Sequence, residues 1–200
     1  MSQIKLPRAE SSLGHPLEML LAQRRTVREF ASKPVSLTQA SCLLWAAQGM
    51  TDPRGLRTAP SAGALYPLEL YLVAGAISGL EAGIYRYLPR ENSLDPLLKG
   101  DRREALAAAA MGQSWIAGAA LILAFVARYS RTTQKYGERG IPDVHIEVGH
   151  AAQNALLTAV ALGLGAGEVG AFDDRRVASV LGLSRDETPL YLVPVGQPAI

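Results

Sequence analysis

The feature that most limits the possible folds is an unbroken apolar run near the middle of the chain. Residues 116–127 carry no polar or charged side chain and contain a single glycine, Gly118. A run of about twelve residues is shorter than the roughly 20 that a helix needs to span a bilayer, so we expect it inside the protein. We interpret residues 119–127 as a central strand. A buried helix is the alternative, because periodicity does not separate the two.

Helical and strand patterns are intermixed along the rest of the chain. Apolar residues recur at helical spacing after Ser36, and Gln39 stands three residues later, which predicts a capping box. Helices are predicted over residues 16–23, 36–48, 101–111, 144–164 and 173–181, with Asp101 as the cap of the third and Asp173 or Asp174 as the cap of the last. Strands are predicted over residues 68–73, 83–88, 119–127 and 189–195, and a short strand or turn over residues 167–172. Neither a repeat nor a linker interrupts this order. The sequence predicts one α+β domain over residues 16–200, preceded by a polar arm over residues 1–15.

Composition excludes several classes of protein. With 48% hydrophobic and 19% charged residues, the chain can bury a core and is not disordered. The single cysteine, Cys42, excludes an internal disulfide and an all-cysteine metal cage, and we expect it to be a buried apolar side chain. A formal charge of +2 argues against a nucleic-acid ligand. Residues 1–10 lack the apolar run of a signal peptide, so a cytoplasmic protein without a membrane partner is expected.

A tight turn of small residues, 60–64 (Pro-Ser-Ala-Gly-Ala), leads into the strand predicted after Pro67. Pro60 and Pro67 restrict the backbone on both sides. Residues 62–64 carry at most one side-chain carbon each, which lets another surface approach the main chain. Such a loop suits a flat ligand laid against main-chain amides. An ordinary strand-entry turn needs the same glycine and proline residues, so this segment alone leaves both interpretations open.

Three arginines and one threonine stand within five residues: Arg24, Arg25, Thr26 and Arg28. If the helix predicted over residues 16–23 continues, spacings of three and four residues bring at least two guanidinium groups together. A guanidinium binds phosphate through two parallel hydrogen bonds, and charge-assisted bonds contribute roughly 1.5–3 kcal/mol each. The cluster is therefore a candidate phosphate site. A solvated basic helix end is the alternative.

The helix predicted over residues 144–164 carries polar residues in one stripe. Glu147, His150, Asn154 and Thr158 are three or four residues apart and so share one face of an otherwise apolar helix. Buried polar groups need partners, which could be other side chains or the polar edge of a ligand. His145 and His150 lie roughly 140° apart around a helix, so their spacing argues against a metal site.

Lys135 and Tyr136 are adjacent groups that can exchange protons, in a polar segment that we predict to be a loop beside Gly137. A surface lysine next to a packed tyrosine is the alternative. A dinucleotide fingerprint is not indicated, because Gly163 and Gly165 end a predicted helix instead of opening one after a strand.

Taken together, these segments resemble the nitroreductase family of flavin enzymes, most closely the branch of SagB-type and thiazole/oxazole-forming dehydrogenases. The matching segments keep the family's order from about residue 15 to the end of the chain. They are residues 24–28 (Arg-Arg-Thr-Val-Arg), 43–49, 60–69, 135–139 (Lys-Tyr-Gly-Glu-Arg), 147–154, 163–165, 169–172 and 193–196. Each segment alone is weakly specific, whereas the ordered set is specific.

The resemblance implies a homodimer with a nitroreductase-like α+β fold, in which a mostly antiparallel mixed sheet is flanked by helices. It also implies FMN bound without a covalent link between the two subunits. The residues implied to bind the phosphate and ribityl chain are Arg24, Arg25, Thr26 and Arg28. Those implied to lie against the isoalloxazine ring come from the other subunit and are Pro60, Ser61, Ala62 and Gly63. The opposite side of the ring is implied to contact Glu168, Val169 and Gly170, and its polar edge Gln113. Lys135 and Tyr136 stand where the azoline-oxidising branch has its acid/base pair.

Two features depart from the family pattern. Ordinary nitroreductases have a C-terminal extension whose basic residues help to bind phosphate, whereas no lysine or arginine follows Arg185 here. Phosphate binding is therefore expected to depend on the first arginine cluster. The azoline-forming enzymes act with a cyclodehydratase partner, and nothing in the sequence reveals one.

Three functions follow from the resemblance and stay open at this point. The first is oxidation of a thiazoline, an oxazoline or a related group in a peptide, with the electrons returned to oxygen. The second is reduction of a nitroaromatic compound or a quinone, driven by NAD(P)H. In both, the flavin carries the electrons and the protein positions it. The third is a flavin-binding protein without catalytic activity.

Overall fold

The computed structural model describes residues 2–9 and 14–199. Its elements in chain order are β1 (Ile4–Lys5), α1 (Leu17–Gln23), β2 (Val35–Ser36), α2 (Leu37–Gln48), the 3₁₀ turn η1 (Ala62–Ala64), β3 (Leu68–Ala74), β4 (Ile77–Ser78), β5 (Gly83–Leu88), β6 (Ser93–Lys99), α3 (Arg103–Ala109), η2 (Ser114–Gly118), β7 (Leu121–Ala127), α4 (Ser130–Tyr136), η3 (Gly137–Arg139), α5 (Gly140–Ala161), β8 (Gly165–Ala166), α6 (Asp174–Leu181) and β9 (Thr188–Gly196).

Among the described residues, seven strands form one sheet in the order β1-β6-β5-β3-β7-β9-β8. Each neighbouring pair in this sheet is antiparallel. Strands β2 and β4 form a separate short parallel pair. The predicted α+β fold with a mostly antiparallel sheet is confirmed.

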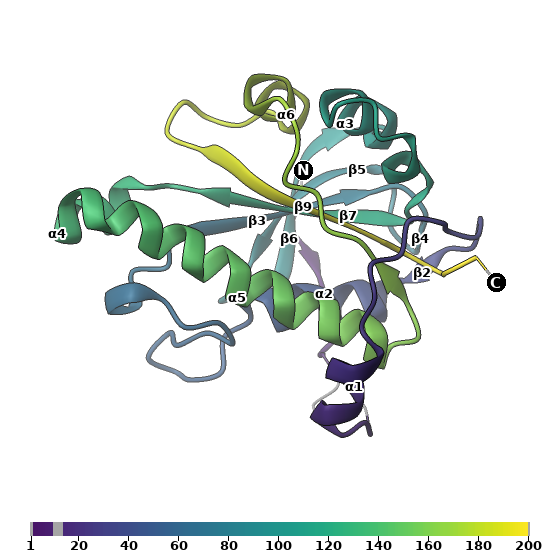
Figure 1. Ribbon diagram of the computed structural model, residues 1–200, viewed down its shortest axis with the longest axis horizontal. Helices are drawn as coiled ribbons and strands as arrows, with labels where there is room; N and C mark the ends of the chain where they lie inside the picture. The colour runs from purple at the N-terminus through teal and green to yellow at the C-terminus, as the bar shows by residue number, and fades with distance from the viewer. Residues whose placement is uncertain (1, 10–13, 200) are drawn as a thin grey trace.

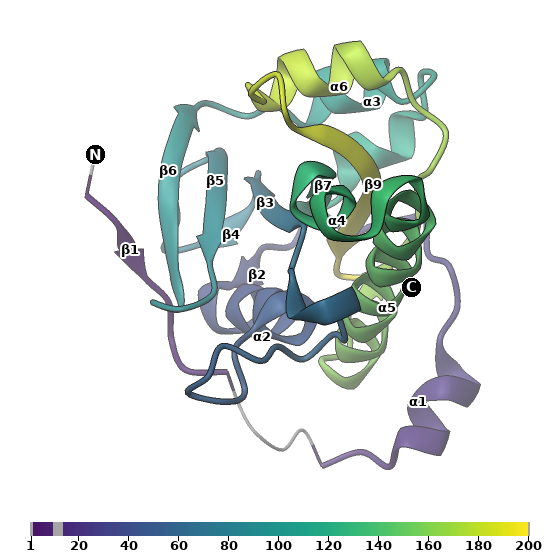
Figure 2. The ribbon, with the colours of Figure 1, turned by 90° about the vertical axis from the view of Figure 1, so that its left-hand side faces the viewer.

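The sheet lies between two layers of helices (Figure 1). Helices α2 and α5 cover one face, and α3 and α6 cover the other, as the view along the sheet also shows (Figure 2). Strand β7 lies in the interior of the sheet, and all its residues are buried. Its side chains alternate between the layers: Leu123 and Phe125 pack into one apolar cluster, and Ile122 and Ala124 pack into the other. The predicted central strand is therefore confirmed.

Side chains cap two helices as predicted. Ser36 and Gln39 form the capping box of α2, with distances of 3.1 Å from the Gln39 N–H nitrogen to Ser36 Oγ and 2.9 Å from the Ser36 nitrogen to Gln39 Oε1. Asp173 accepts a backbone N–H of the first turn of α6 at 2.9 Å. The predicted cap at Asp101 is wrong in position, because α3 begins two residues later and Asp101 accepts the backbone N–H of Arg103.

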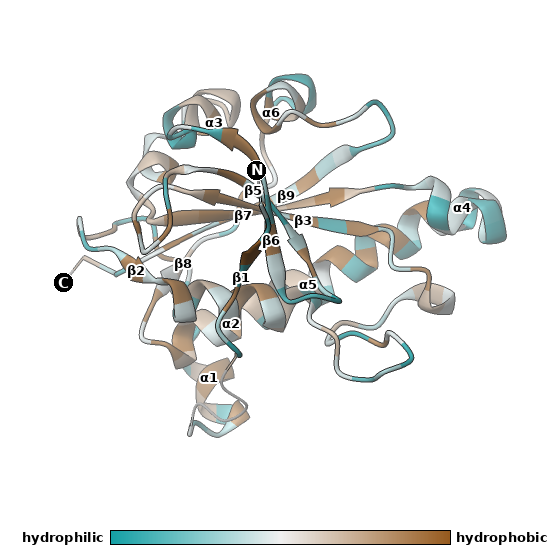
Figure 3. Cartoon of the chain, turned by 180° about the vertical axis from the view of Figure 1, so that it is seen from behind, coloured by the Kyte–Doolittle hydropathy of each residue, from teal (hydrophilic) through white to brown (hydrophobic). Residues whose placement is uncertain are grey.

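The segment 128–139, predicted to be a loop, contains helix α4. Most of its side chains reach solvent, so it lacks the apolar stripe by which a packed helix is detected in sequence. Figure 3 shows this difference, with hydrophilic colours on α4 and hydrophobic colours on the strands of the sheet. Helix α5 follows through η3 and begins at Gly140 instead of the predicted Val144.

The outer edge of the sheet also differs from the prediction. Strand β6 was not expected, because it contains Asp95 and Pro96, two residue types that are uncommon within strands. The first residues, predicted to be an irregular arm, contain β1, in which Ile4 pairs with Leu94. Leu6 is buried beside this pair. The described part of this segment therefore packs against the domain.

Candidate functional site

The predicted phosphate-binding residues lie on an extended segment, not on a helix. Helix α1 ends at Gln23, and Arg24 has left the helical region, with φ −54° and ψ 123°. Thr26 forms a parallel bridge with Ala166, and the Val27 N–H donates to the Ala166 carbonyl oxygen at 2.8 Å. The expectation that a continuing helix gathers the guanidinium groups is therefore wrong.

Glu168 brings two of these side chains together instead. Arg24 Nη1 donates to Glu168 Oε1 at 3.2 Å, and Thr26 Oγ1 donates to Glu168 Oε2 at 2.7 Å. Residues two apart on an extended chain point to the same side, so one carboxylate reaches both. The Arg24 side chain is still 30% exposed. A guanidinium and a hydroxyl therefore stand side by side at the surface.

The other two arginines have different neighbours. Arg25 Nη1 donates to the backbone oxygens of Ala22 at 2.9 Å and of Arg24 at 2.7 Å, so it braces the end of α1. The Arg28 guanidinium carbon lies 5.7 Å from the centre of the Trp115 ring. Arg28 thus keeps its hydrogen-bonding edge available while the face of the cation is held by an aromatic ring.

The segment 168–170 is fixed against β9. Val169 and Leu192 exchange backbone hydrogen bonds of 2.9 and 3.0 Å. Gln113, predicted at the polar edge of a ring, uses Nε2 to donate to the backbone oxygens of Ala110 at 3.0 Å and Ala171 at 3.1 Å. Its amide nitrogen therefore holds this segment in place. We refer to Arg24, Thr26, Arg28 and Glu168 as the anion end of the site.

The small-residue loop and the Lys135–Tyr136 pair, far apart in sequence, meet in the structure. Gly63 has a positive φ of 62°, and a Cβ at this position would lie 2.6 Å from the Tyr136 hydroxyl oxygen and 3.0 Å from Lys135 Nζ. The positive φ therefore favours glycine here, and a Cβ would displace the tips of the Tyr136 and Lys135 side chains. Lys135 Nζ lies 5.2 Å from the centre of the Tyr136 ring. An amine and a phenol thus face the backbone of the loop.

Both residues lie in the last turn of α4, so the prediction that they stand in a loop is wrong. Arg131, one turn earlier, ties this helix to the strand entry. Its Nη1 donates to the Tyr66 backbone oxygen at 2.9 Å, and its Nη2 donates to the Glu69 carboxylate. Charge-assisted hydrogen bonds of this kind hold α4 against the loop. Sequence reasoning missed Arg131, because the contact joins residues that are far apart in the chain.

A second set of contacts shapes the loop itself. Ser61 Oγ accepts the Tyr66 N–H at 2.9 Å. The Arg57 guanidinium carbon lies 4.5 Å from the centre of the Tyr66 ring, and Arg57 Nη1 donates to Gln48 Oε1 at 2.6 Å. Burial lowers the pKa of Arg57, and the charges of nearby carboxylates oppose this shift. The loop is therefore a braced structure before any ligand is present.

Glu147, from the predicted polar stripe, lies beneath this loop. It is 2% exposed, and its Oε1 has no hydrogen-bond partner among the described residues. Burial raises the pKa of Glu147 to about 7, while the Ser61 hydroxyl and the Arg57 charge act in the opposite direction. In the same predicted stripe, Asn154 Nδ2 donates to the backbone oxygen of Thr58 at 3.4 Å. His150 is exposed.

A cavity of about 230 Å³ opens over Glu147. Its lining residues are Pro60, Ser61, Ala62, Asp143, Ile146, Glu147 and His150. The cavity joins the loop predicted to carry a flat ligand with a buried carboxyl group. We refer to Ser61–Gly63, Lys135, Tyr136 and Glu147 as the loop end of the site.

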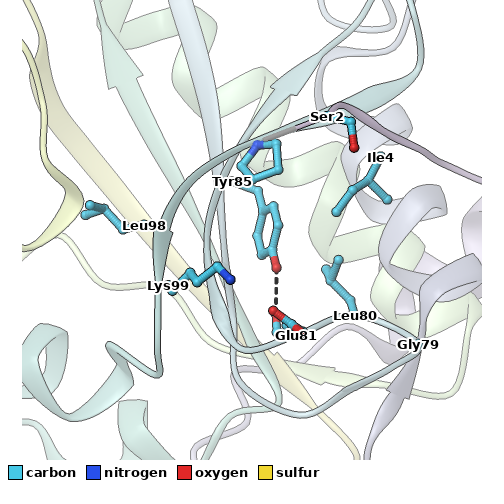
Figure 4. Close-up of a pocket in the computed structure, with 9 residues that line it drawn as sticks. Ser2, Ile4, Gly79, Leu80, Glu81, Tyr85, Leu98 and Lys99 are labelled. Carbon is cyan, nitrogen blue, oxygen red and sulfur yellow. Dashed lines mark hydrogen bonds between the residues drawn. The ribbon is translucent and has the colours of Figure 1, made fainter.

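A larger cavity of about 370 Å³ lies at the β1 edge of the sheet (Figure 4). Its lining residues are Ser2, Ile4, Gly79, Leu80, Glu81, Tyr85, Pro96, Leu98 and Lys99. The Tyr85 hydroxyl there donates to the backbone oxygen of Glu81 at 2.8 Å. The lining contains none of the predicted site residues, so we do not place the candidate site there.

The buried carboxyl of Glu147 predicts a specific dependence of stability on pH. In the unfolded chain the group titrates near 4.5, and in the folded protein near 7. Between these values the folded state binds the proton more tightly, so stability is present at low pH and is lost as the pH rises. From about pH 5 to about pH 8, this group removes about 2–3 kcal/mol from the free energy of unfolding.

The Glu147→Gln variant is expected not to lose stability in this way as the pH rises. Urea unfolding of the wild type and the variant at a series of pH values measures the free energy of unfolding. Asp143→Asn is the control, because Asp143 is a half-buried carboxyl on the same helix. Parallel pH profiles for the wild type and Glu147→Gln would show that Glu147 ionises normally.

Among residues 2–9 and 14–199, no group of three or more His, Cys, Asp or Glu side chains is placed to hold a metal ion. Cys42 is buried, as expected. Within the same part of the chain, no helix combines the length and apolar character that crossing a bilayer requires.

The anion end and the loop end lie at opposite ends of α5 (Figure 1). Glu147 marks the loop end, in the early turns of the helix, and the Thr26–Ala166 bridge lies just beyond its last residue, Ala161. At about 1.5 Å per residue, roughly 20 Å of helix separates Glu147 from Ala161. A single chain therefore presents two distant halves of a site.

Comparison with known proteins finds relatives that match this chain over most of its length. The model of the nitroreductase family matches residues 21–197. The protein named "Putative nitroreductase MJ1384" from Methanocaldococcus jannaschii is 46% identical over 195 residues, which make up 98% of this chain and 96% of that protein. The crystal structure of a "putative nitroreductase" from Ralstonia eutropha has a TM-score of 0.87 and 32% identity, and the match covers 99% of this chain and 90% of that one.

A third relative is named for the processing of microcin B17. The microcin B17-processing protein McbC of Escherichia coli is 29% identical over 165 residues, which are 79% of this chain and 61% of McbC. The chain therefore spans less than two thirds of that protein. A chain in the structure of the E. coli microcin synthetase McbBCD complex with truncated pro-MccB17 bound matches with a TM-score of 0.79 and 25% identity, over 97% of this chain and 77% of that one.

Proposed function

The chain belongs to the nitroreductase family, and on this premise we propose that it is an FMN-dependent oxidoreductase whose sites are shared between two copies of the chain. The observation that carries the proposal is the separation of the anion end from the loop end by α5. Neither end alone offers both a phosphate site and a surface for a flat ring. In a twofold dimer, the anion end of one subunit can meet the loop end of the other, which gives two equal sites.

Exposed apolar side chains favour this pairing. Leu17 and Leu21 of α1 are 58% and 52% exposed. Ile141 and Ile146 of α5 are 42% and 53% exposed. The first two lie near the anion end and the other two at the loop end, so a contact between unlike ends would cover both groups. Burial of such a side chain contributes roughly 1.5–3 kcal/mol.

At the anion end, Arg24 and Arg28 would bind the phosphate of FMN, and Thr26 would add a hydroxyl for the phosphate or ribityl chain. Glu168 supports this role, because it holds Arg24 and Thr26 in fixed positions before the ligand arrives. Arg25 would join only by releasing the backbone oxygens that it now contacts.

At the loop end, Pro60, Ser61, Ala62 and Gly63 would lie against the ring. The first N–H groups of a helical turn have no partner within it, so η1 can present amides to an acceptor. Glu168, Val169 and Gly170 of the other subunit would lie on the opposite side, with Gln113 beside them. When bound, FMN would supply two-electron chemistry.

The substrate that we propose is an azoline ring, or a related group, in a peptide. Oxidation of a thiazoline to a thiazole removes two electrons and two protons, and oxygen would be the final acceptor of the electrons. The pair formed by the Tyr136 hydroxyl and the Lys135 amine, both beside Gly63, would take up the one proton that leaves the ring carbon and pass it to solvent. The other hydrogen would leave the ring with the electron pair, for which bound FMN would be the acceptor. Support comes from the Lys-Tyr pair and from similarity to McbC and to the peptide-bound McbBCD complex.

Reduction of a nitroaromatic compound or a quinone by NAD(P)H is the second candidate. It is favoured by the relative from M. jannaschii, which is named a nitroreductase and matches this chain over nearly its whole length. The two candidates share the cofactor and the dimer and differ in the electron donor.

An absorbance spectrum tests the shared part of the proposal. The purified protein is expected to be yellow, or to become yellow with FMN, at one flavin for each chain. Anaerobic mixing with NAD(P)H then separates the candidates: rapid bleaching indicates the reductase, and bleaching by a thiazoline peptide alone indicates the dehydrogenase. A colourless protein that takes up no added FMN would exclude both.

A further inference from the structure

Glu147 is a buried group for which the proposed chemistry above has no use. Its carboxyl lies under the loop that would carry the ring, its Oε1 has no hydrogen-bond partner among the described residues, and it is 2% exposed. It lines the cavity of about 230 Å³ together with Ser61 and Ala62. Ser61 lines this cavity beside it, and the Ser61 hydroxyl lowers the pKa of Glu147 against the effect of burial.

Ser61 has a single proton to donate and two lone pairs with which to accept. One lone pair already accepts the Tyr66 N–H at 2.9 Å. If Glu147 is ionised, its carboxylate can only accept, and the Ser61 O–H turns toward it. If Glu147 is protonated, its own O–H can donate to the second lone pair of Ser61, and the Ser61 O–H becomes free to point into the site.

We propose that Glu147 is a positioning residue that determines, through Ser61, whether the loop end donates a side-chain hydrogen bond to the bound flavin. The inference rests on the proposed function, because it assumes that the ring lies against Ser61. Protonated Glu147 favours flavin binding, and ionised Glu147 disfavours it.

Several charged or titratable groups surround this pair. They are Arg57 from the loop before Ser61, Asp143 and His150 from α5, and Lys135 and Tyr136 from α4 beyond Gly63. Arg57 opposes protonation of Glu147, and burial favours it more strongly, with a resulting pKa of about 7. The change in Ser61 is therefore expected close to neutral pH.

The experiment is a titration of the full chain with FMN at about pH 6 and at about pH 8. Protein fluorescence or flavin absorbance gives the dissociation constant for the wild type, Glu147→Gln, Ser61→Ala and Asp143→Asn. The phosphate of FMN titrates near pH 6, which by itself changes the affinity of every variant with pH. The change in affinity from about pH 6 to about pH 8 is therefore compared between each protein and Glu147→Gln. Over this interval the affinity of the wild type and of Asp143→Asn is expected to fall about tenfold more than that of Glu147→Gln, which is the effect of one hydrogen bond.

Glutamine carries an N–H that can donate to Ser61 at every pH, so Glu147→Gln is expected to resemble the wild type at low pH. Ser61→Ala removes the hydroxyl that transmits the effect, and its affinity is expected to change with pH as little as that of Glu147→Gln. If Glu147→Gln does not fold, Ser61→Ala takes its place as the variant with which the wild type is compared. The difference between the infrared spectra of ligand-free wild type and Glu147→Gln is expected to show a protonated carboxyl at about pH 6.

Three results would overturn the inference. The first is the same loss of affinity in the wild type and Glu147→Gln, which would leave the proposed function intact. The second is an ionised Glu147 in the infrared spectrum at about pH 6. The third is no binding of FMN by any variant at either pH, which would overturn the proposed function as well.

Discussion

The double variant Arg24→Ala, Arg28→Ala is expected to bind FMN at least about 100-fold more weakly than the wild type. Each guanidinium can form charge-assisted hydrogen bonds with a phosphate, worth roughly 1.5–3 kcal/mol each, and every 1.4 kcal/mol is about tenfold in affinity. No lysine or arginine follows Arg185 in the chain. The described segment therefore has no second basic cluster beyond β9 to replace the lost contacts.

Fluorescence titration with FMN measures this effect. The matched control is Arg54→Ala, Arg90→Ala, which removes the same charge from two exposed arginines that belong to neither named end of the site. Loss of Arg24 leaves Glu168 with Thr26 as its side-chain partner, so circular dichroism and thermal unfolding must show that the variant is folded. Equal affinities for the double variant and the control would refute the assignment of the anion end to phosphate.

The elements that the sequence predicts correctly are those determined by burial or by contacts between residues close together in the chain. Strand β7 has apolar residues on both faces because both helical layers cover it, and its unbroken apolar run shows this directly. The capping box at Ser36 is equally local, since donor and acceptor lie three residues apart. By contrast, α4 is stabilised by contacts from Arg131 to Tyr66 and Glu69, and no pattern within the helix reports them.

In the candidate site, too, the sequence indicated local features and missed the contacts between distant residues. Residue types suggested a phosphate cluster, a small-residue loop and an acid/base pair, but not their arrangement. Arg24 meets Thr26 through Glu168, a residue far away in sequence, and not through helical spacing. The contact between Gly63 and Tyr136 depends on how α4 leaves β7. Glu147 was visible as a polar residue on an apolar helix, yet its lack of a partner emerges only from the folded chain.

In the proposed function, the separation of the two ends would join three weak sequence signals in one site. Each end is prepared without ligand: Glu168 orients Arg24 and Thr26, and Arg131 holds α4 against the strand entry. Pre-organisation lowers the entropic cost of binding. With α5 keeping the ends roughly 20 Å apart, we infer that the dimer is a condition for flavin binding. Variants that weaken the dimer should then lose flavin together with their partner.

Tyr136→Phe and Lys135→Ala are each expected to slow oxidation of a thiazoline peptide by about 10²- to 10⁴-fold while leaving FMN bound. A positioned general base accelerates a reaction by this range, and phenylalanine keeps the ring while removing the atom that accepts the proton. The Tyr136 hydroxyl and Lys135 Nζ both face Gly63, beside the proposed ring position. Neither residue is among those proposed to bind the FMN phosphate or to lie against its ring, so affinity for FMN should stay close to that of the wild type.

The measurement is anaerobic bleaching of the FMN-loaded protein by the peptide, followed in a stopped-flow instrument, with the FMN content of each variant determined first. Tyr129→Phe is the matched control, because Tyr129 immediately precedes α4. Its hydroxyl oxygen lies 2.5 Å from Nε2 of His145, a residue outside the proposed site. If NAD(P)H bleaches all variants at the wild-type rate and the peptide bleaches none, the reductase is the correct function. Unchanged bleaching by the peptide in Tyr136→Phe and Lys135→Ala would instead show that another group accepts the proton. Glu147, buried on the other side of the same loop, would then be the next residue to test.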